Sequence, residues 1–306
     1  MNTNKKTLTF CIIGCGRIGI NLAVFLSSHQ FHAKGFASKN FKSAKKACKV
    51  TKQGKAFKNP CDAAKDCDLI FITTPDNLIE KLCHDLAKQN AFSKDSIVFH
   101  LSGALDSKIL MSAKKNKAYI GSIHPLQSFP AYKSSKKSLF KGINISIEGD
   151  KKAVIIGKKI AHTLGAKPFI ISSKAKTLYH ASAVVASNYL VTLQDFALNM
   201  MKKSGLSEKD AYKLLEPLIN GTLSNIKEKG CIKALTGPVL RYDIDIIKQH
   251  LQEIDKNFKH FSKLYRLLGL YTLDLAKKNN KISKKKEKIK AIKLKNLLQQ
   301  KTIIKY

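Results

Sequence analysis

The sequence lacks several features that mark common classes of protein. Its seven cysteines are odd in number and never form a Cys-x-x-Cys pair, which argues against a disulfide framework and a zinc site. No run of about 18 apolar residues occurs, so we expect no membrane span. The short apolar run near the N-terminus breaks into glycines, so we interpret it as a first strand rather than a secretion signal. These absences predict a soluble cytoplasmic protein with reduced thiols and no metal.

Arginine is scarce although the chain is very basic. The formal net charge is +35, yet the only arginines are Arg17, Arg241 and Arg266. Base readout and bidentate phosphate binding favour arginine, so we interpret the lysines as solvated surface charge and do not expect a nucleic-acid partner. The positive field would still attract anionic cofactors and a small anionic substrate.

Strand-like and helix-like segments alternate through the first half of the chain. Apolar, strand-like runs occupy 7–14, 31–38, 67–75, 96–103, 118–125, 142–149 and 167–173. Helical patterns separate most of them, which predicts a doubly wound parallel sheet of the Rossmann type. After residue 173 only helical patterns follow. We therefore predict a dinucleotide-binding domain over 1–172, an all-helical domain over 173–276 and a lysine-rich tail over 277–306.

A glycine-rich motif follows the first predicted strand and opens a helix. Gly14, Gly16 and Gly19, with Arg17 and Ile18 between the last two, form Gly-x-Gly-x-x-Gly. In dinucleotide-binding folds the first glycine makes a tight turn, the second lets the backbone approach a pyrophosphate, and the third lets the helix pack on the strand. The free N–H groups at the helix start favour an anion. The motif predicts a dinucleotide cofactor held by these five residues.

An acidic residue is missing where NAD-dependent proteins usually have one. The second predicted strand ends at Ser38 and Lys39, and no Asp or Glu precedes Asp62. A carboxylate at that strand end binds the ribose hydroxyl of NAD, whereas serine and lysine can bind the 2′-phosphate of NADP. We therefore predict NADP(H) with contacts from Ser38 and Lys39. The alternative, that Lys39 is one more surface lysine, stays open.

Three predicted strand ends carry polar residues. They are Thr74 with Pro75, Ser102, and His124 in the segment GSIHPLQSFP. Ligands bind beyond the carboxyl ends of parallel strands, so we expect these residues to line one crevice. Thr74 and Pro75 would contact the cofactor, whereas Ser102 and His124 would contact the substrate. A structural role for His124, as a loop residue bonded to a backbone carbonyl, is the alternative.

Polar residues recur along the helix predicted after residue 173. Lys176, His180, Ser187 and Asn188 are spaced so that they share about a third of the helix circumference, which indicates a polar site on a core-forming helix. The alternative is an exposed Lys176 and a core His180. Arg241 follows a Thr-Gly-Pro turn, and its planar guanidinium suits a carboxylate, although it could be a plain surface residue.

Several motifs together resemble a family of Rossmann-like oxidoreductases that have a helical C-terminal domain of unknown function. The family belongs to the superfamily of pyrroline-5-carboxylate reductase, prephenate dehydrogenase and the hydroxyacid dehydrogenases. The resemblance covers about residues 7–276, and Tyr242 stands where the family usually has glycine. Its motifs here are HLSGAL (100–105), GSIHPLQSF (121–129), SIEGD (146–150), KTLYHASAVVASNYL (176–190), NGTLSN (220–225) and ALTGPVLRYD (234–243).

The resemblance implies a function and roles for single residues. Some family members are similar to ketopantoate reductase, which serves pantothenate synthesis, so we expect NADPH-dependent reduction of a small 2-oxo acid. Lys176 and Asn188 match the site lysine and asparagine of hydroxyacid dehydrogenases, and His124 matches the His-Pro element of prephenate dehydrogenases. Catalysis would involve Lys176, His124, Asn188, His180 and Ser102, with Lys176 or His124 as the proton donor. Ser102, His124, Ser187 and Arg241 would bind the substrate.

Other functions and the assembly stay open. Imine reduction like that of pyrroline-5-carboxylate reductase, prephenate-type dehydrogenation, and dinucleotide or nucleic-acid binding without catalysis are the alternatives. The apolar surface of the long helix predicts a homodimer through the helical domain. The lysines of 277–306 predict a solvated tail, with a membrane-surface or nucleic-acid arm as the alternative.

Overall fold

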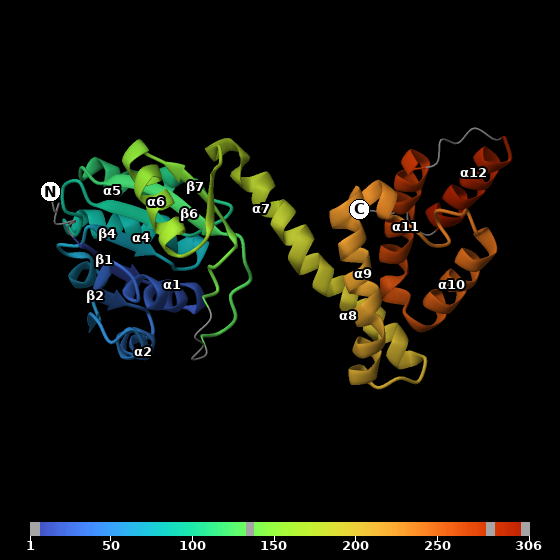
Figure 1. Ribbon diagram of the computed structural model, residues 1–306, viewed down its shortest axis with the longest axis horizontal. Coiled ribbons are helices and arrows are strands. Elements are labelled where there is room, and N and C mark those ends of the chain that lie inside the picture. Colours follow the sequence, from blue (N-terminus) through green and yellow to red (C-terminus); the bar gives the residue numbers. More distant parts are fainter. Residues whose placement is uncertain (1–6, 133–137, 280–284, 301–306) are drawn as a thin grey trace. The chain divides into compact units, whose positions relative to one another are not determined.

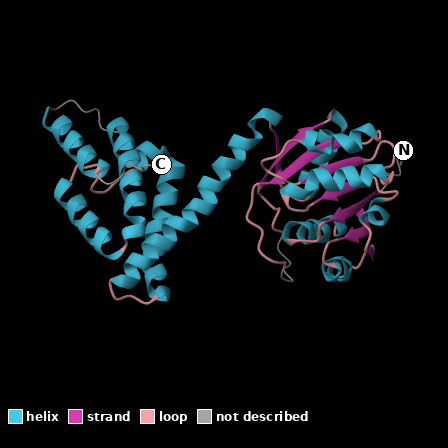
Figure 2. Ribbon diagram, turned by 180° about the vertical axis from the view of Figure 1, so that it is seen from behind, coloured by secondary structure: helices cyan, strands magenta, loops and turns pink. Residues whose placement is uncertain are grey.

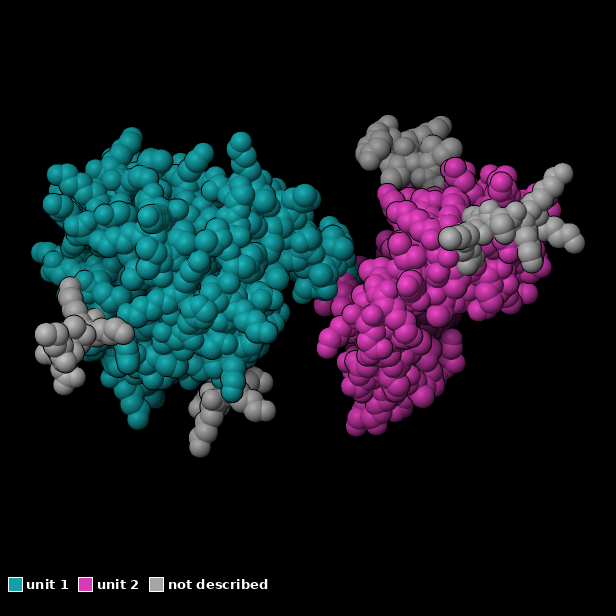
Figure 3. Space-filling model, turned by 45° about the horizontal axis from the view of Figure 1, so that its top comes forward, with its two compact units in different colours: residues 1–189 teal, residues 190–306 magenta. Residues whose placement is uncertain are grey.

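The computed structural model describes residues 7–132, 138–279 and 285–300. The chain forms two compact units, Met1–Tyr189 and Leu190–Tyr306, which Figure 3 shows in different colours. The division falls after Tyr189 rather than near residue 172. The first turns of the helix predicted after residue 173 therefore belong to the unit that contains the sheet.

A sheet forms the centre of the first unit, and Figure 2 shows its strands in magenta. It has eight strands in the order β3-β2-β1-β4-β5-β6-β7-β8. Neighbouring strands are parallel except β6 and β7, which pair antiparallel. This mostly parallel sheet confirms the predicted doubly wound class. The strands are β1 Leu8–Ile13, β2 Phe31–Ala37, β3 Lys55–Phe57, β4 Leu69–Ile72, β5 Ile97–His100, β6 Tyr119–Pro125, β7 Asn144–Gly149 and β8 Lys167–Ile170.

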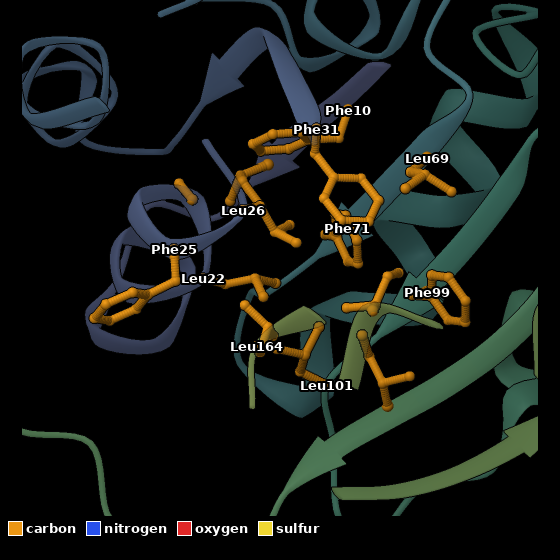
Figure 4. Packing of buried hydrophobic residues seen from close by; sticks show 14 of the residues in the cluster. Phe10, Leu22, Phe25, Leu26, Phe31, Leu69, Phe71, Phe99, Leu101 and Leu164 are labelled. Carbon is orange, nitrogen blue, oxygen red and sulfur yellow. The ribbon is translucent and has the colours of Figure 1, made fainter. Parts of the chain in front are cut away.

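Helices cover both faces of the sheet because the central strands are apolar on both sides. Along β1, Phe10 and Ile12 join one buried cluster, whereas Cys11 and Ile13 join another. This alternation is what a parallel strand buried on both faces requires. Figure 4 shows the first cluster, where Leu22 and Leu26 of one helix pack with Phe71 of the sheet.

The first cluster packs against helices α1, α2 and α6, and the second against α3, α4 and α5. The helical elements of this unit are α1 Arg17–Ser27, α2 Phe41–Thr51, α3 Pro60–Ala64, α4 Asp76–Lys88, the short turn η1 Ser107–Leu110, α5 Met111–Lys115, α6 Lys151–Thr163, the turn η2 Ser173–Ala175, α7 Lys176–Val184 and the π-helical turn η3 Val185–Tyr189.

In the described part of the second unit all regular elements are helices, as the sequence predicts (Figure 1). Its elements are α8 Leu190–Lys203, α9 Glu208–Ala234, α10 Ile244–Asn257, α11 Lys259–Asn279 and α12 Lys285–Gln299. Pro217 lies inside α9. The non-helical residue of α9 is Gly230, with φ of 72°.

The prediction of a solvated lysine tail is wrong for most of its length. The tail's first residues complete α11, and Lys285–Gln299 form α12. Ala291, Leu294 and Leu298 are buried in the same cluster as Leu251 of α10 and Leu273 of α11. Apolar residues spaced three and four apart give α12 one buried face, whereas the lysines among its described side chains lie on the other faces. The remaining residues of the predicted tail, 280–284 and 301–306, lie outside the described residues.

In the described parts of the chain, no helix has the length and apolar character needed to cross a bilayer. The same residues contain no group of three or more His, Cys, Asp and Glu side chains that could hold a metal ion.

Candidate active site

The glycine motif forms a close-packed turn between β1 and α1. Gly14 has φ of +113°, and a Cβ there would lie 2.7 Å from the Thr73 backbone carbon. A Cβ on Gly19 would lie 2.2 Å from the Gly14 carbonyl oxygen. Gly14 does not accept a side chain because its φ lies in the left-handed region. Gly19 does not accept one because the helix packs against the turn at this residue.

Gly16 differs from these two glycines. A Cβ on Gly16 would meet no atom within 4 Å. Helix α1 begins here with no hydrogen bond from a side-chain cap, so its first N–H groups are not satisfied by a capping side chain. An uncapped helix start beside a glycine without steric neighbours suits the approach of a phosphate, and Arg17 is exposed on the first turn. The predicted cofactor residues Gly14, Gly16 and Gly19 thus form a cradle that fits a dinucleotide.

Three further predicted cofactor contacts lie near this turn. The Thr74 hydroxyl is buried without a hydrogen-bond partner, and the Thr74 backbone nitrogen would lie 2.8 Å from a Cβ on Gly14. An orphaned buried hydroxyl is uncommon and suits a ligand atom. Ser38 follows Ala37, whose carbonyl accepts a hydrogen bond from the Gly14 N–H. This bond brings the end of β2, with exposed Lys39, to the glycine turn.

Ser102 lies two residues beyond the end of β5, close to where the sequence predicts a polar strand end, but its hydroxyl has local partners. It donates to Asp76 Oδ2 at 2.7 Å and accepts from the backbone N–H groups of Ala104 and Leu105. These bonds tie the turn after β5 to the start of α4. The Ser102 side chain therefore orders a loop, and its carbonyl oxygen remains as the atom that faces Lys176.

His124 and His180 meet at Gly103, just beyond the end of β5. The two rings are 5.8 Å apart and nearly perpendicular. A Cβ on Gly103 would lie 2.6 Å from His180 Nδ1 and 2.8 Å from His124 Nε2. Only glycine leaves room for both imidazoles here. His180 Nδ1 is buried and has no hydrogen-bond partner.

His124 is uncharged at neutral pH. Burial, followed by the positive charge of Lys176 and by His180, lowers the pKa of His124 from 6.5 to about 4. Its Nδ1 is 3.1 Å from the Tyr179 hydroxyl. Tyr179 thus fixes the ring orientation and leaves Nε2 directed toward Gly103. A neutral imidazole can hydrogen-bond a substrate oxygen but is a poor source of a full proton.

Lys176, the first residue of α7, is fully buried, so the alternative of an exposed first-turn lysine is excluded. Its Nζ donates to the Ser102 carbonyl at 2.9 Å and to Ser122 Oγ at 2.6 Å. Burial lowers the pKa of Lys176 from 10.5 to about 8, and Glu148 is the foremost group that opposes this decrease. The amine is therefore mostly protonated at neutral pH although it is buried.

The side chain of Glu148, on strand β7, lies close to the Lys176 amine. Ser122 and Glu148 are direct cross-strand partners on β6 and β7, so their side chains share one face of the sheet. The Glu148 carboxylate accepts hydrogen bonds from the Ser107 N–H, the Ser107 hydroxyl, the Ser122 hydroxyl and the Ser173 hydroxyl. Its Oε1 is 3.9 Å from Lys176 Nζ. Four elements of the fold therefore converge on one buried carboxylate.

Ser187 and Asn188, predicted to share a helix face with Lys176 and His180, are exposed. The π-helical turn Val185–Tyr189 contains both residues and separates them from α7. The wider turn changes their angular register, so the spacing argument from a regular helix fails at this point. Their roles stay predictions.

Arg241 belongs to the second unit, and its Nε donates to Asp243 Oδ2 at 2.9 Å. Its side chain is 63% exposed. Tyr242, which stands where the related family usually has glycine, keeps the left-handed conformation with φ of 57°. The tight turn is thus retained with tyrosine. A substrate-binding role for Arg241 stays a prediction.

Sequence reasoning missed Glu148, Ser122 and Tyr179. An acid within the apolar strand run GINISIEG was a usable signal, because a buried carboxylate needs partners. The pairing of Glu148 with Ser122 was not readable, since it depends on β7 running antiparallel to β6.

Two family models, named below, each match a part of the chain. No curated protein matches it. Among solved structures, the fold is similar to a Bacteroides fragilis protein whose name proposes an NADP oxidoreductase, with TM-score 0.74, 22% identity, and coverage of 87% of this chain and 98% of that one. A Thermotoga maritima protein whose name states no activity gives TM-score 0.66, 27% identity and coverage of 88% and 98%.

A third similar structure is the pyrroline carboxylate reductase of Plasmodium falciparum with NADP bound, with TM-score 0.56, 14% identity and coverage of 88% of this chain and 98% of that one. The family matches follow the order of the fold. Residues 2–125 match the Rossmann-like domain, and residues 143–272 match the domain of unknown function DUF2520. The N-terminal part of the chain is therefore similar to Rossmann-like domains, and the part that follows is similar to DUF2520 domains.

Proposed function

We propose that this protein is an NADPH-dependent oxidoreductase that reduces a small, anionic carbonyl or imine compound. The observation that carries the proposal is the helix start at Gly16, which has no side-chain cap and has room for an approaching phosphate. The names of the Bacteroides and Plasmodium proteins, which refer to NADP, support the same cofactor. Gly14, Gly16, Arg17, Ile18 and Gly19 would hold its pyrophosphate.

The end of β2 supports NADP rather than NAD. Ser38 and exposed Lys39 follow the strand, and no acid precedes Asp62 to repel a 2′-phosphate. Bound NADPH would supply a hydride to the electrophilic carbon of the substrate.

Two side chains of the candidate site would act on the substrate oxygen or nitrogen. His124, held by Tyr179, would donate a hydrogen bond from its neutral ring. Lys176 would stabilise the negative charge that develops during hydride transfer, because a fixed cation in a site without water acts strongly at short range. The amine has no exposed surface, so proton delivery by Lys176 requires movement of the amine or of the Gly103 turn. Charge stabilisation is thus the role that this arrangement supports directly.

The substrate class has two candidates. The motif resemblance favours a 2-oxo acid, with ketopantoate as the first choice, and its product would be pantoate. The pyrroline carboxylate reductase among the similar structures favours a cyclic imine carboxylate instead. Both classes combine a polar double bond with a carboxylate, for which exposed Arg241 is a candidate partner.

A panel of 2-oxo acids and cyclic imines, followed by NADPH absorbance, tests the proposal. We expect turnover with one class and a preference for NADPH over NADH. Lys176→Met should lower kcat about 100-fold to 1,000-fold, as loss of one strong electrostatic donor does in other enzymes. An absence of NADPH oxidation with every compound, in a protein that binds NADPH, would contradict the catalytic proposal.

We also propose that the active form is a homodimer built through the helical unit. Helix α9 exposes several large apolar side chains, among them Leu214 (58% exposed) and Leu218 (67% exposed). An exposed apolar face of this kind is unfavourable in water and is typical of a protein–protein interface. Sedimentation analysis should give twice the mass of the 34.0 kDa chain. The double variant Leu214→Glu/Leu218→Glu should sediment as a folded monomer, whereas a wild-type monomer would contradict the proposal.

A further inference from the structure

Lys176, Ser122 and Glu148 form a buried polar cluster, in which the Ser122 hydroxyl connects the Lys176 amine to the Glu148 carboxylate. Ser122 Oγ accepts a hydrogen bond from Lys176 Nζ at 2.6 Å and donates one to Glu148 Oε1 at 2.7 Å. All three residues are nearly inaccessible, with exposures of 0% for Ser122, 3% for Glu148 and 0% for Lys176. Solvent therefore cannot replace a missing partner in this chain of hydrogen bonds.

The need for a counter-charge follows from the position of the amine. Burial of an ammonium group favours its neutral form. Lys176 is also the first residue of α7, where the positive end of the helix dipole disfavours a second positive charge. A nearby acidic group offsets these effects in addition to the hydrogen bonds of the amine, and Glu148 Oε1, at 3.9 Å, is close enough to do so.

Other titratable groups surround the amine as well. Asp106 at the start of η1 and Asp76 at the start of α4 favour the charged amine, in that order after Glu148. His100 at the end of β5 and His124 on β6 also interact electrostatically with Lys176, and both are held neutral by burial and by its charge. Asp76 is exposed, so solvent screens its effect. Glu148 is the buried carboxylate among them.

The hydrogen bonds of Glu148 indicate that its role is more than filling space. Its carboxylate accepts from four donors on η1, β6 and the turn η2, which immediately precedes α7. These bonds hold the carboxylate within reach of both the Ser122 hydroxyl and the Lys176 amine. The same serine thus has its lone pair directed toward the amine and its proton directed toward the acid.

We propose that Glu148 and Ser122 are positioning residues for the reaction, which keep the buried Lys176 amine charged and oriented toward the end of β5. The inference rests on the proposed function, because it assumes that the charged amine assists turnover. Only the protonated amine can stabilise an alkoxide or pass on a proton. Activity should therefore decrease as the pH rises through the pKa of Lys176, and removal of the Glu148 charge should move this decrease to lower pH.

The first measurement does not depend on activity. Isotope-labelled lysine is introduced into the full chain, and the resonance that disappears in Lys176→Met is assigned to Lys176. We expect its titration midpoint in Glu148→Gln to lie at least about one pH unit below that of the wild type, with a smaller shift in the same direction for Ser122→Ala. An unchanged midpoint in folded Glu148→Gln overturns the inference.

Matched controls separate this role from general damage to the sheet. Asp68→Asn removes a half-buried carboxylate that binds Thr9, and Ser96→Ala removes a buried hydroxyl without a hydrogen-bond partner. Neither should move the Lys176 midpoint. If Glu148→Gln does not fold, Ser122→Ala still tests the inference, because only one hydroxyl is lost, and an unchanged midpoint there counts against it equally.

The second measurement is the pH profile of kcat with saturating substrate. In Glu148→Gln, the decrease of kcat at alkaline pH should shift to lower pH by the same interval as the titration midpoint of Lys176. KM should be nearly unchanged. An alkaline decrease that stays in place in an active variant overturns the positioning role. Conversely, the Lys176 midpoint could shift in Glu148→Gln while the wild-type protein oxidises no NADPH. This result would contradict the proposed function and would still establish the coupling between Glu148 and Lys176.

Discussion

At the scale of single residues, the account depends on a lysine that the sequence located and only the structure explains. Helical spacing from Lys176 to Asn188 suggested one polar face, but the structure buries Lys176 and exposes Asn188. Spacing predicts which residues share a face of a regular helix. It cannot predict that the π-helical turn interrupts this helix or that Glu148 on a distant strand balances the lysine charge.

Burial of Lys176 should appear in the pH dependence of stability. Its pKa is about 8 in the folded protein and 10.5 ordinarily. Between these values the unfolded chain binds more protons, so the free energy of unfolding of the wild type rises with pH relative to Lys176→Met, by at most about 1.4 kcal/mol per pH unit. Denaturant unfolding of both proteins across this interval measures the difference. A difference that is constant with pH would mean that the amine titrates as it does in water.

The glycine turn allows a contrast between three substitutions. Gly16→Ala should leave the melting temperature nearly unchanged, because the new methyl group meets no atom, but should weaken NADPH binding at least about tenfold. Gly221→Ala also adds a methyl group into open space, and it should not affect NADPH affinity. Gly14→Ala should instead destabilise the fold, because φ is +113° and the Cβ would contact the Thr73 backbone. Equal NADPH affinities for Gly16→Ala and Gly221→Ala would refute the assigned cradle.

At the scale of secondary-structure elements, the sequence predicted the alternating half of the chain well. Within CDLIFITTP, the strand LIFI is apolar throughout and is flanked by Asp68 and Thr73, so its type and its place in the order of elements were readable. The sequence did not reveal the three-residue β3 or the antiparallel direction of β7, because strand direction depends on pairing and not on local pattern. The same reasoning failed for α12, where the number of lysines obscured the apolar spacing of Ala291, Leu294 and Leu298.

Helix α12 should contribute to the stability of the helical unit. A Cβ on Gly269 would lie 2.7 Å from Leu298 Cδ2, which indicates close packing of α11 and α12. Leu298→Ala should therefore lower the free energy of unfolding by about 2–5 kcal/mol. Ile292→Ala on the same helix is a matched control, since Ile292 is 59% exposed and should change stability little. Comparable losses in the two variants would mean that α12 is not docked as described.

Arg266 supports this view of α12. Its buried guanidinium binds Asp255 at 2.9 Å and the Leu297 carbonyl at 3.1 Å, so it connects α10, α11 and α12. One of the three arginines thus serves a structural purpose that the sequence did not suggest. A deletion from residue 277 onward would remove α12, and loss of function in such a variant would not indicate a nucleic-acid arm.

At the scale of the whole molecule, the net charge of +35 is the dominant property. A positive field attracts an anionic cofactor and is screened by salt, because the Debye length is about 8 Å at physiological ionic strength. NADPH affinity should therefore decrease between low and high salt, and calorimetric titrations at several salt concentrations measure the slope. An affinity independent of salt would mean that the surface lysines do not contribute to cofactor capture.

The central claim is that the glycine turn and the end of β2 form an NADPH site. Fluorescence titration of the wild-type chain with NADPH and with NADH tests this claim most directly. The account predicts saturable binding with higher affinity for NADPH, and loss of that preference in the double variant Ser38→Ala/Lys39→Ala. Failure of the folded wild type to bind either nucleotide would contradict it.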